Sequence, residues 1–504
     1  MNKKLLIISI IITLIYSIIT LNTVLHHEVW ADEAQVWQIC THLSIKDLLI
    51  HLKNEGHPAL FYLMIMPFAK LFSDIIYMKL LCWLFMCFSV FLLLYYSPFK
   101  LYTKIAIILS AGFLYFFPVL ARNYSIIPFL VFLAAILYKK SKQYPILYAI
   151  ILALIANTHI IMFMFTICLG IIFYYENIIL EIRKGFSNKL IKNFIAILII
   201  IIGLLFIFFE LSNTPNSNVF LKINIYNNLL ATLRIFLLFF INSYNYDIGL
   251  NTALNNPILD LLSILLLIIL YILLFINLLI NNKKLFAVAL LSIGFQLGIY
   301  IFAYNSFVYV NRIFCAHIIL IFCFWVLLQN NNFKPKYKIF GKKSINILLT
   351  LFFMLTIYNG INYTKLDLSL NYSGAKETAD YIRANINPNN SVIIIDNEPY
   401  MISLVYYLRD THRIYSAFRK KYLDYVRWDN ITVSNYADLG WSKYIEYLKE
   451  TDKRDYYVIN VSSDKRHLLE KTQKDYFKLI FKSKKAVEPF EGYRIFKFIG
   501  HQNN

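Results

Sequence analysis

The segment 26–58, which follows the first apolar stretch, holds the side chains best suited to chemistry. It contains Asp32 and Glu33 and, further on, His57 within Glu55-Gly56-His57-Pro58. Ionised carboxylates next to lipid are costly unless a ligand or partner compensates them. An acidic pair there can act as a general base on an acceptor hydroxyl or as metal ligands. The pair also fits an acidic turn that caps a helix predicted over Ala34–Cys40, so both interpretations stay open.

Basic and polar side chains interrupt later apolar runs. Arg122 lies between two such runs and is suited to pair with a phosphate, or to extend its charge to the membrane interface. Arg312 is a second candidate anion ligand, or an interfacial anchor together with Tyr309. His57 can donate to a phosphate or sugar oxygen, or can simply belong to a turn before a helix. His159 is either a ligand of the same kind or part of a polar turn between helices.

These residues share one placement although they are far apart in the chain. Each is predicted at the same, external end of an apolar segment. Convergence of acids, histidines and arginines there predicts a cavity that opens outward and is bordered by helices facing lipid. Such a cavity suits a lipid-phosphate substrate, whose head group needs cations and whose tail needs a hydrocarbon surface.

The composition indicates that these residues belong to an integral membrane protein. The 504 residues are 59% hydrophobic and only 15% charged, with a mean hydropathy of +0.58. The first segment, Leu5–Leu25, follows two lysines and runs on without a small-residue cleavage site, so we interpret it as a retained signal anchor.

Eleven segments are predicted to span the bilayer, although several are shorter than the roughly 20 residues that a crossing needs. They are Leu5–Leu25, Ile75–Tyr96, Ile105–Pro118, Tyr124–Tyr138, Ile146–Ala156, Ile160–Tyr175, Phe194–Leu211, Ile258–Ile280, Leu285–Tyr304, Ile313–Leu328 and Ile345–Ile361.

The net charge of +20 is distributed by loop rather than gathered for nucleic acid. Lysines and arginines fall in alternate loops, for example at Lys3, Lys140 and Lys284, which is the positive-inside pattern of a membrane protein. The N-terminus is then cytoplasmic, and the candidate site and the tail after Tyr363 are extracytoplasmic. This orientation requires 59–72 and 229–241 to be re-entrant or surface-lying rather than crossing helices. The six cysteines show no disulfide or metal-ligand spacing and fit small buried residues.

The tail has the character of a second domain, so we divide the chain into a membrane domain, 1–363, with a catalytic first external loop, 26–58, and a soluble α/β domain, 364–504. Helices are predicted over Gly374–Ile386 and Tyr400–Leu408 around a turn at 387–390. Asp396 and Glu398 can bind a ligand or serve loop solvation. The predicted strands are Ser391–Ile395, Asp455–Val461, Phe477–Ser483 and Tyr493–Ile499, the last pairing with the third.

The order of the motifs resembles that of the bacterial relatives of protein O-mannosyltransferases and lipid A aminoarabinose transferases. The motifs are Trp30-Ala31-Asp32-Glu33-Ala34, Gly56-His57-Pro58-Ala59-Leu60, Ala121-Arg122-Asn123-Tyr124, Thr158-His159 and Arg312. These relatives are GT-C glycosyltransferases, similar to glycosyltransferase family 39. The chain departs from the family pattern at Ala59, where a second proline is common, and after Arg312.

The resemblance implies a GT-C fold of about 11 transmembrane helices in a bacterial inner membrane, with an extracytoplasmic α/β domain. It implies transfer of a sugar from a polyprenyl-phosphate donor to a protein, lipid or cell-envelope glycan, with inversion. Asp32 would be the catalytic base or orient the acceptor, and Glu33 would support it or help to hold a divalent metal, which the motifs do not require. The residues that would bind the donor phosphate and substrate are His57, Arg122, Tyr124, His159 and Arg312.

Three other functions are compatible with a membrane protein of this kind, and one of them is a binding or sensory protein that uses the tail as its receptor. A lipid-linked oligosaccharide flippase or transporter would carry inverted repeats and charges near the midplane. A polysaccharide polymerase or ligase would place its main residues in a late external loop, whereas this chain has them in the first.

Overall fold

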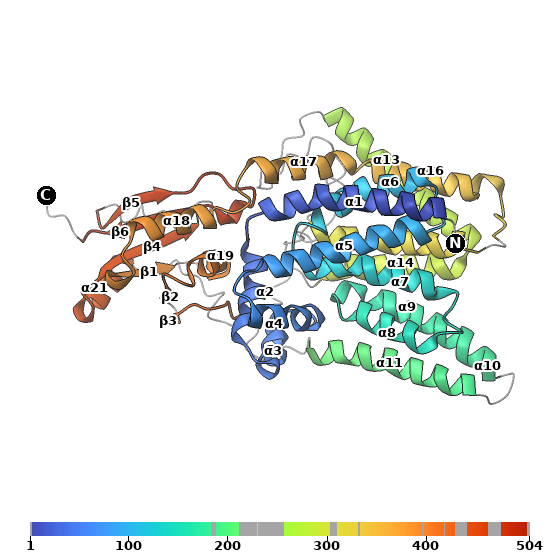
Figure 1. The fold of residues 1–504 in the computed structure, drawn as a ribbon, viewed down its shortest axis with the longest axis horizontal. Coiled ribbons are helices and arrows are strands. Elements are labelled where there is room, and N and C mark those ends of the chain that lie inside the picture. Colours follow the sequence, from blue (N-terminus) through green and yellow to red (C-terminus); the bar gives the residue numbers. More distant parts are fainter. Residues whose placement is uncertain are drawn as a thin grey trace.

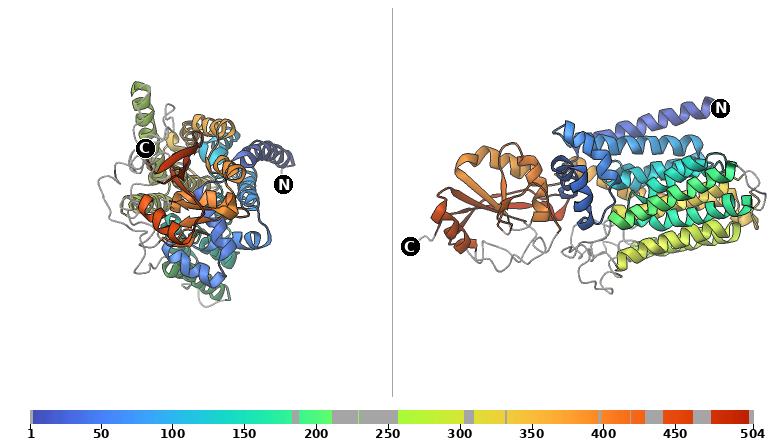
Figure 2. Two further views of the ribbon diagram at one scale, coloured as in Figure 1. Left: turned by 90° about the vertical axis from the view of Figure 1, so that its left-hand side faces the viewer. Right: turned by 90° about the horizontal axis from the view of Figure 1, so that it is seen from below.

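The computed structural model describes residues 3–182, 188–210, 229, 257–302, 310–330, 333–395, 398–417, 419–428, 441–461 and 475–500. The molecule is elongated, with a bundle of helices at one end and a sheet domain at the other (Figure 1). The start of α1 lies at the end of the bundle away from the sheet (Figures 1 and 2).

Seven stretches of the described chain are long and apolar enough to cross a membrane. At 1.5 Å per residue, a 20-residue helix covers the roughly 30 Å of a hydrocarbon core. Five of them are α1 (Lys3–His26), α5 (Ile76–Tyr96), α11 (Asn188–Glu210), α13 (Pro257–Asn281) and α14 (Lys283–Phe302). The sixth runs over Ile160–Ile182 and contains α9 (Phe163–Tyr174), and the seventh joins α16 (Lys342–Met354) to α17 (Ile357–Ser369).

Shorter helices complete the bundle. They are α6 (Leu101–Leu109), the π-helical turn η2 (Gly112–Phe116), the 3-10 turn η3 (Asn123–Ile126), α7 (Ile127–Tyr138), α8 (Pro145–Ala156), the 3-10 turn η4 (Ile160–Met162) and α15 (Val310–Leu328). Each of the eleven predicted spans coincides, over its described residues, with helical structure, which confirms the prediction of a multi-pass helical membrane protein. The prediction for Ile105–Pro118 was too simple, because this stretch is divided into α6 and η2.

Three helices lie between the bundle and the sheet domain: α2 (Ala31–His42), α3 (Ile45–His51) and α4 (Leu60–Leu71) (Figure 1). Helix α4 has 12 residues, as α7 and α8 do, and covers about 18 Å. It packs against α2, and that 59–72 does not cross the bilayer stays a prediction. Of the second segment for which we predicted this behaviour, 229–241, all but Leu229 lies outside the described residues.

The C-terminal domain is a six-stranded mixed sheet in the order β3-β2-β1-β4-β6-β5. Strand β1 is parallel to β2 and β4, while β3, β6 and β5 are added antiparallel. The strands are β1 (Ser391–Ile395), β2 (Ile414–Ser416), β3 (Lys421–Tyr422), β4 (Asp455–Val461), β5 (Phe477–Lys482) and β6 (Tyr493–Phe498), and the helices are α18 (Ala375–Asn385), α19 (Glu398–Leu408) and α21 (Trp441–Thr451).

The four predicted strands are present with at most one residue of difference at an end, and β6 pairs with β5 as predicted. The short strands β2 and β3 and the helix α21 were not predicted. Helix α17 runs on to Ser369, beyond the division that we placed at Tyr363.

One apolar core joins this domain to the layer beneath it. It contains side chains of α2 and α4, such as Trp37 and Ile65, together with Met401 of α19 and Ile395 of β1. Helix α19 packs directly on α2. The domain is therefore fixed against the helix that carries the acidic pair.

Candidate active site

The first turn of α2 presents Asp32 and Glu33 in opposite surroundings. A helix favours acidic residues in its first turn because of the positive end of its dipole, which explains why the chain turns helical here. The Asp32 side chain is 34% exposed, whereas that of Glu33 is completely buried. The two adjacent carboxylates therefore have different roles.

Glu33 anchors the backbone of the third predicted motif, which begins at Ala121. Its Oε1 accepts a hydrogen bond of 2.7 Å from the Ala121 amide and lies 3.5 Å from His27 Nε2. Burial raises the pKa of Glu33, but the positive charges of His27 and Lys79 outweigh burial and leave that pKa below its usual value. Because Ala121 directly precedes Arg122, this hydrogen bond fixes the position of the Arg122 backbone.

Arg122 joins the acidic turn to His57. Its Nη1 donates to the Asp32 backbone oxygen at 2.6 Å, and its Nη2 lies 3.5 Å from Asp32 Oδ2. Burial disfavours the charged guanidinium, but the Asp32 carboxylate raises the pKa of Arg122 above its ordinary value. Arg122 is thus a permanent cation, only 6% exposed.

His57 is placed by the turn that the sequence predicted. Gly56 has φ +71°, a left-handed conformation that favours glycine. His57 Nε2 lies 3.2 Å from Arg122 Nη2. Since a guanidinium only donates, Nε2 must accept, and the proton of a neutral ring is on Nδ1. Burial, together with Arg122, His159 and Arg312, lowers the pKa of His57 well below 6.5, so the ring is neutral at pH 7.

The Nδ1 of His57 is buried and has no hydrogen-bond partner within the described residues. A buried donor without a partner costs roughly 1–3 kcal/mol. This N–H is therefore suited to an acceptor atom of a ligand.

Tyr124 links His159 to Arg312. Nδ1 of His159 accepts from the Ile161 amide at 3.2 Å, so its Nε2 carries the proton and donates to the Tyr124 hydroxyl, also at 3.2 Å. The same hydroxyl accepts from Arg312 Nε at 2.8 Å. The ring centroids of His159 and His57 are 5.3 Å apart, so Tyr124, His159 and Arg312 lie next to His57 and Arg122.

The structure thus brings together every predicted site residue. We call His57, Arg122, Tyr124, His159 and Arg312 the basic cluster. It contains two guanidinium groups, and the Asp32 carboxylate lies at one edge. Glu33 lies next to the cluster but contacts Ala121 and His27 rather than Asp32.

Sequence reasoning missed the buried partners behind Glu33. His27 Nδ1 lies 2.7 Å from Asp367 Oδ2, which also accepts from the Tyr115 hydroxyl at 2.8 Å. Two histidines at the end of the first apolar span were a signal for His27. Asp367 had no such signal, because it lies on the last turns of α17 without a motif around it.

The acidic pair does not form a shared set of metal ligands. Glu33 is engaged by an amide and a histidine, and the nearest charge to Asp32 is an arginine. In the part of the chain that the structure describes, no group of three or more His, Cys, Asp or Glu side chains is arranged to hold a metal ion.

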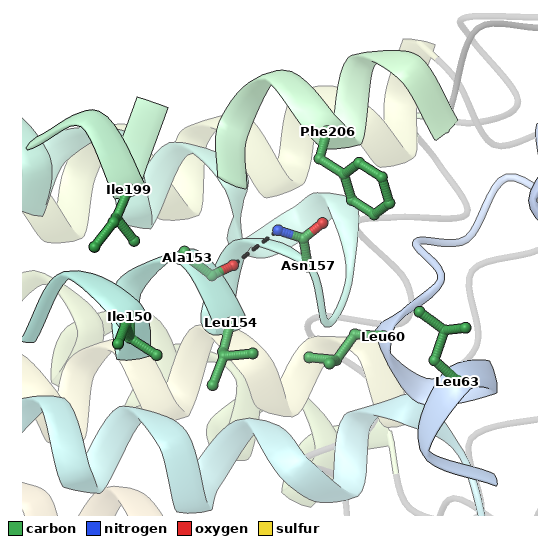
Figure 3. A pocket seen from close by; sticks show the side chains of 8 residues that line it. All are labelled: Leu60, Leu63, Ile150, Ala153, Leu154, Asn157, Ile199 and Phe206. Carbon is green, nitrogen blue, oxygen red and sulfur yellow. Dashed lines mark hydrogen bonds between the residues drawn. The ribbon is translucent and has the colours of Figure 1, made fainter. Parts of the chain in front are cut away.

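An apolar pocket of about 250 Å³ lies between α4, α8 and α11 (Figure 3). It is lined by Leu60, Leu63, Ile150, Ala153, Leu154, Asn157, Ile199 and Phe206. The Asn157 amide is turned back to the backbone oxygens of Ala153 and Gly203, which leaves hydrocarbon as the main lining. Leu60 follows His57 by three residues, and Asn157 precedes His159 by two, so two residues of the lining are near neighbours of the basic cluster along the chain.

Among known proteins, similarity is found to solved structures but not to family models or curated proteins. A solved structure of ArnT from Cupriavidus metallidurans bound to undecaprenyl phosphate aligns with 99% of this chain and 98% of that chain, with a TM-score of 0.39 and 9% sequence identity. No family model matches the chain. No curated protein matches it either.

Proposed function

We propose that this chain is a membrane glycosyltransferase that moves a sugar from a polyprenyl-phosphate donor to an extracytoplasmic acceptor, with inversion at the anomeric carbon. The observation that carries this proposal is the series of contacts from the partly exposed Asp32 carboxylate through the buried basic cluster, and an apolar pocket is lined in part by chain neighbours of His57 and His159. The acceptor is a protein, a lipid or a cell-envelope glycan.

The basic cluster supports binding of a phosphate. Arg122 and Arg312 bring two permanent positive charges, against the single carboxylate of Asp32. Arginine is the side chain best matched to phosphate oxygens, and its charge is worth more where water is excluded. The partnerless Nδ1–H of His57 is a further donor for a phosphate oxygen, and the neutral rings of both histidines fit without adding charge.

The apolar pocket supports a lipid as the carrier of that phosphate. Its lining of leucine, isoleucine and phenylalanine favours burial of a hydrocarbon chain at about 25 cal/mol per Å² of apolar surface. Because Leu60 and Asn157 of the lining are within three positions of His57 and His159 in the chain, we expect an isoprenoid chain to lie in the pocket while its phosphate meets the basic cluster.

The arrangement of Asp32, Arg122 and Arg312 supports the following chemistry. The acceptor oxygen attacks the anomeric carbon and passes its proton to the Asp32 carboxylate, while the bond from that carbon to the phosphate oxygen breaks. The electron pair stays on the polyprenyl phosphate, and Arg122 and Arg312 stabilise the charge. One displacement inverts the anomeric centre. No step is assigned to a metal, because the two acids do not offer joint ligands.

The location of the charges favours this function over transport. In the cluster, all charged groups lie at the end of the bundle that faces the sheet domain. A translocation path would need such groups near the midplane. With the lysine-rich loops in the cytoplasm, the site and the α/β domain are extracytoplasmic, and we propose the inner membrane of a bacterium as the location.

Transfer from labelled polyprenyl-phosphate sugars in proteoliposomes tests the proposal. Asp32→Asn removes the base and is expected to lower kcat by roughly 10²–10⁴-fold. Arg122→Gln is expected to cost roughly 10²–10³-fold, since a preorganised donor to the leaving group is lost. Arg122→Lys keeps a positive charge and should retain part of the activity.

The matched controls are Asp380→Asn on α18 and Arg413→Gln just before β2, each of which breaks an exposed ion pair. They are expected to transfer at the wild-type rate and to unfold at the wild-type temperature, and thermal unfolding of Asp32→Asn and Arg122→Gln shows that each is folded at the temperature of the assay. Full activity of a folded Asp32→Asn protein would remove Asp32 from the mechanism. Absence of transfer by wild type with any polyprenyl-phosphate sugar would refute the function itself.

The proposed orientation is tested by cysteine labelling in intact cells. All six native cysteines are buried, so a single introduced thiol reports its own side. Lys140→Cys is expected to react only after the membrane is made permeable, whereas Asp380→Cys reacts from outside. The reverse pattern would invert the orientation and place the site in the cytoplasm.

A further inference from the structure

Helix α2 lacks a cap from its own sequence. Its N-cap residue is Trp30, whose side chain makes no capping hydrogen bond. The amide of the first helical residue, Ala31, instead donates to Oε1 of Glu491 at 2.5 Å. Glu491 belongs to the C-terminal domain, in the 3-10 turn η10 (Pro489–Glu491) that precedes β6, and it is buried. The first turn of α2 is therefore completed by a residue 460 positions further along the chain.

Glu491 is itself held firmly. Its other carboxylate oxygen accepts from the Ser373 hydroxyl at 2.5 Å, and its backbone oxygen accepts from the Gly374 amide at 2.8 Å. A Cβ on Gly374 would lie 2.8 Å from the Glu491 backbone oxygen, so only glycine allows this approach. Next to these contacts, the Glu488 amide donates to the Tyr372 oxygen at 2.9 Å. The carboxylate is thus fixed from the domain side.

The cap acts on the residue next to Asp32. Asp32 follows Ala31 directly, and its backbone oxygen receives the 2.6 Å hydrogen bond from Arg122. A shift of the first turn of α2 changes both this bond and the 3.5 Å separation between the Asp32 carboxylate and Arg122. A displacement of about 1 Å at a reacting group costs as much as 10²-fold in rate.

We propose that Glu491 is a positioning residue for the transfer reaction: by capping α2 from the C-terminal domain, it sets the place of the Asp32 carboxylate relative to Arg122. The inference rests on the proposed function, in which Asp32 takes the acceptor proton. It makes the α/β domain a structural part of the active site, and Glu491 touches neither substrate in this role.

The cap depends on an acceptor oxygen rather than on a full negative charge. Burial raises the pKa of Glu491 to about 7, and hydrogen bonds from Ser373 and Ala31 act against that rise, whereas the nearby Asp32 carboxylate adds to it. A neutral amide in the same position offers the same acceptor to Ala31. Glutamine is therefore expected to replace Glu491, and alanine is not.

Two measurements on the full-length protein in detergent test this inference. Hydrogen exchange of the amides in 31–35 is expected to be at least about five-fold faster in Glu491→Ala, as the loss of a helix cap implies, and near wild type in Glu491→Gln. For sugar transfer, Glu491→Ala is expected to lower kcat by roughly 10- to 100-fold with the KM for the lipid-linked donor unchanged, and Glu491→Gln to restore most of it.

The control is Glu446→Ala, the same substitution at an exposed position on α21 of the same domain. It should change neither measurement. If wild type transfers no sugar but the exchange pattern appears, the proposed function fails and the cap remains. If wild type is active and Glu491→Ala matches it in exchange or in kcat, or Glu491→Gln is as poor as alanine, the positioning role is refuted.

Discussion

The buried histidine behind the acidic turn makes the stability of this protein sensitive to pH. His27 lies between Asp367 at 2.7 Å and Glu33 at 3.5 Å, and these side chains are at most 1% exposed. Burial alone would lower the pKa of His27, but the two carboxylates outweigh it and raise that pKa from 6.5 to about 9. The folded protein therefore holds this proton more tightly than the unfolded chain does.

The sign and size of the effect follow from linkage. A histidine with a raised folded-state pKa contributes stability that is complete below about pH 6.5 and is lost as the pH rises through about 9. The difference between 6.5 and about 9 corresponds to about 3 kcal/mol in the free energy of unfolding. About 1 kcal/mol of this is still to be lost above pH 8.

The perturbation is His27→Gln, which keeps a polar side chain but cannot carry the charge. Unfolding by a denaturing detergent in mixed micelles, measured at several pH values from 6 to 9.5, gives the free energy of unfolding for both proteins. Glu491 and Glu488 have pKa values raised to about 7 and about 8, and their contributions also fall with rising pH. These contributions have largely gone by about pH 8, and the difference in slope between wild type and His27→Gln above that pH reports His27.

His27→Gln is expected to be less stable than wild type at pH 6.5, and wild type should lose about 1 kcal/mol more stability than the variant between pH 8 and 9.5. Equal slopes for the two proteins would refute the reasoning, because the proton would then be held elsewhere.

Three further outcomes follow from the packing and the site. Ile150→Trp fills the far end of the apolar pocket and should raise the KM for a long-chain donor more than the KM for a short-chain donor. Leu147→Trp, at an exposed position on the same helix and outside the lining, should change neither KM. Equal effects of Ile150→Trp on both chain lengths would contradict a role of the pocket in binding the lipid. Gly203→Val should lower the free energy of unfolding by about 1–3 kcal/mol, since a Cβ there would lie 2.6 Å from that of Ala153 and force α11 away from α8, and an unchanged unfolding curve would contradict this. Tyr124→Phe removes the hydroxyl that joins a histidine to an arginine and should raise the donor KM roughly tenfold, and a wild-type KM in steady-state transfer assays would exclude that contribution.

Much of the fold was predictable because the signals are local. A run of apolar residues between basic loops predicts a spanning helix whatever lies around it, and alternating or buried apolar runs bounded by turns predicted the strands of the tail. The short strands β2 and β3 are only three and two residues long, so they have too little sequence to show a period. Their conformation depends on pairing with a neighbouring strand.

The site residues were predicted by type and position, but their relations were not. Asp32 and Glu33 are equivalent in sequence, and helical geometry turns one to the basic cluster and the other into the core. The tautomers of His57 and His159 follow from partners that are 65 and 2 residues away, namely Arg122 and the amide of Ile161.

The sequence alone therefore determined the membrane class, the helices and the kinds of side chain available for chemistry, since hydropathy, charge and turn residues act over a few neighbours. Only the tertiary structure decided that Asp32 contacts Arg122, that Asp367 raises the pKa of His27 and that Glu491 caps α2. These contacts join residues from 90 to 460 positions apart. Their energies depend on burial and distance, which the order of residues does not contain.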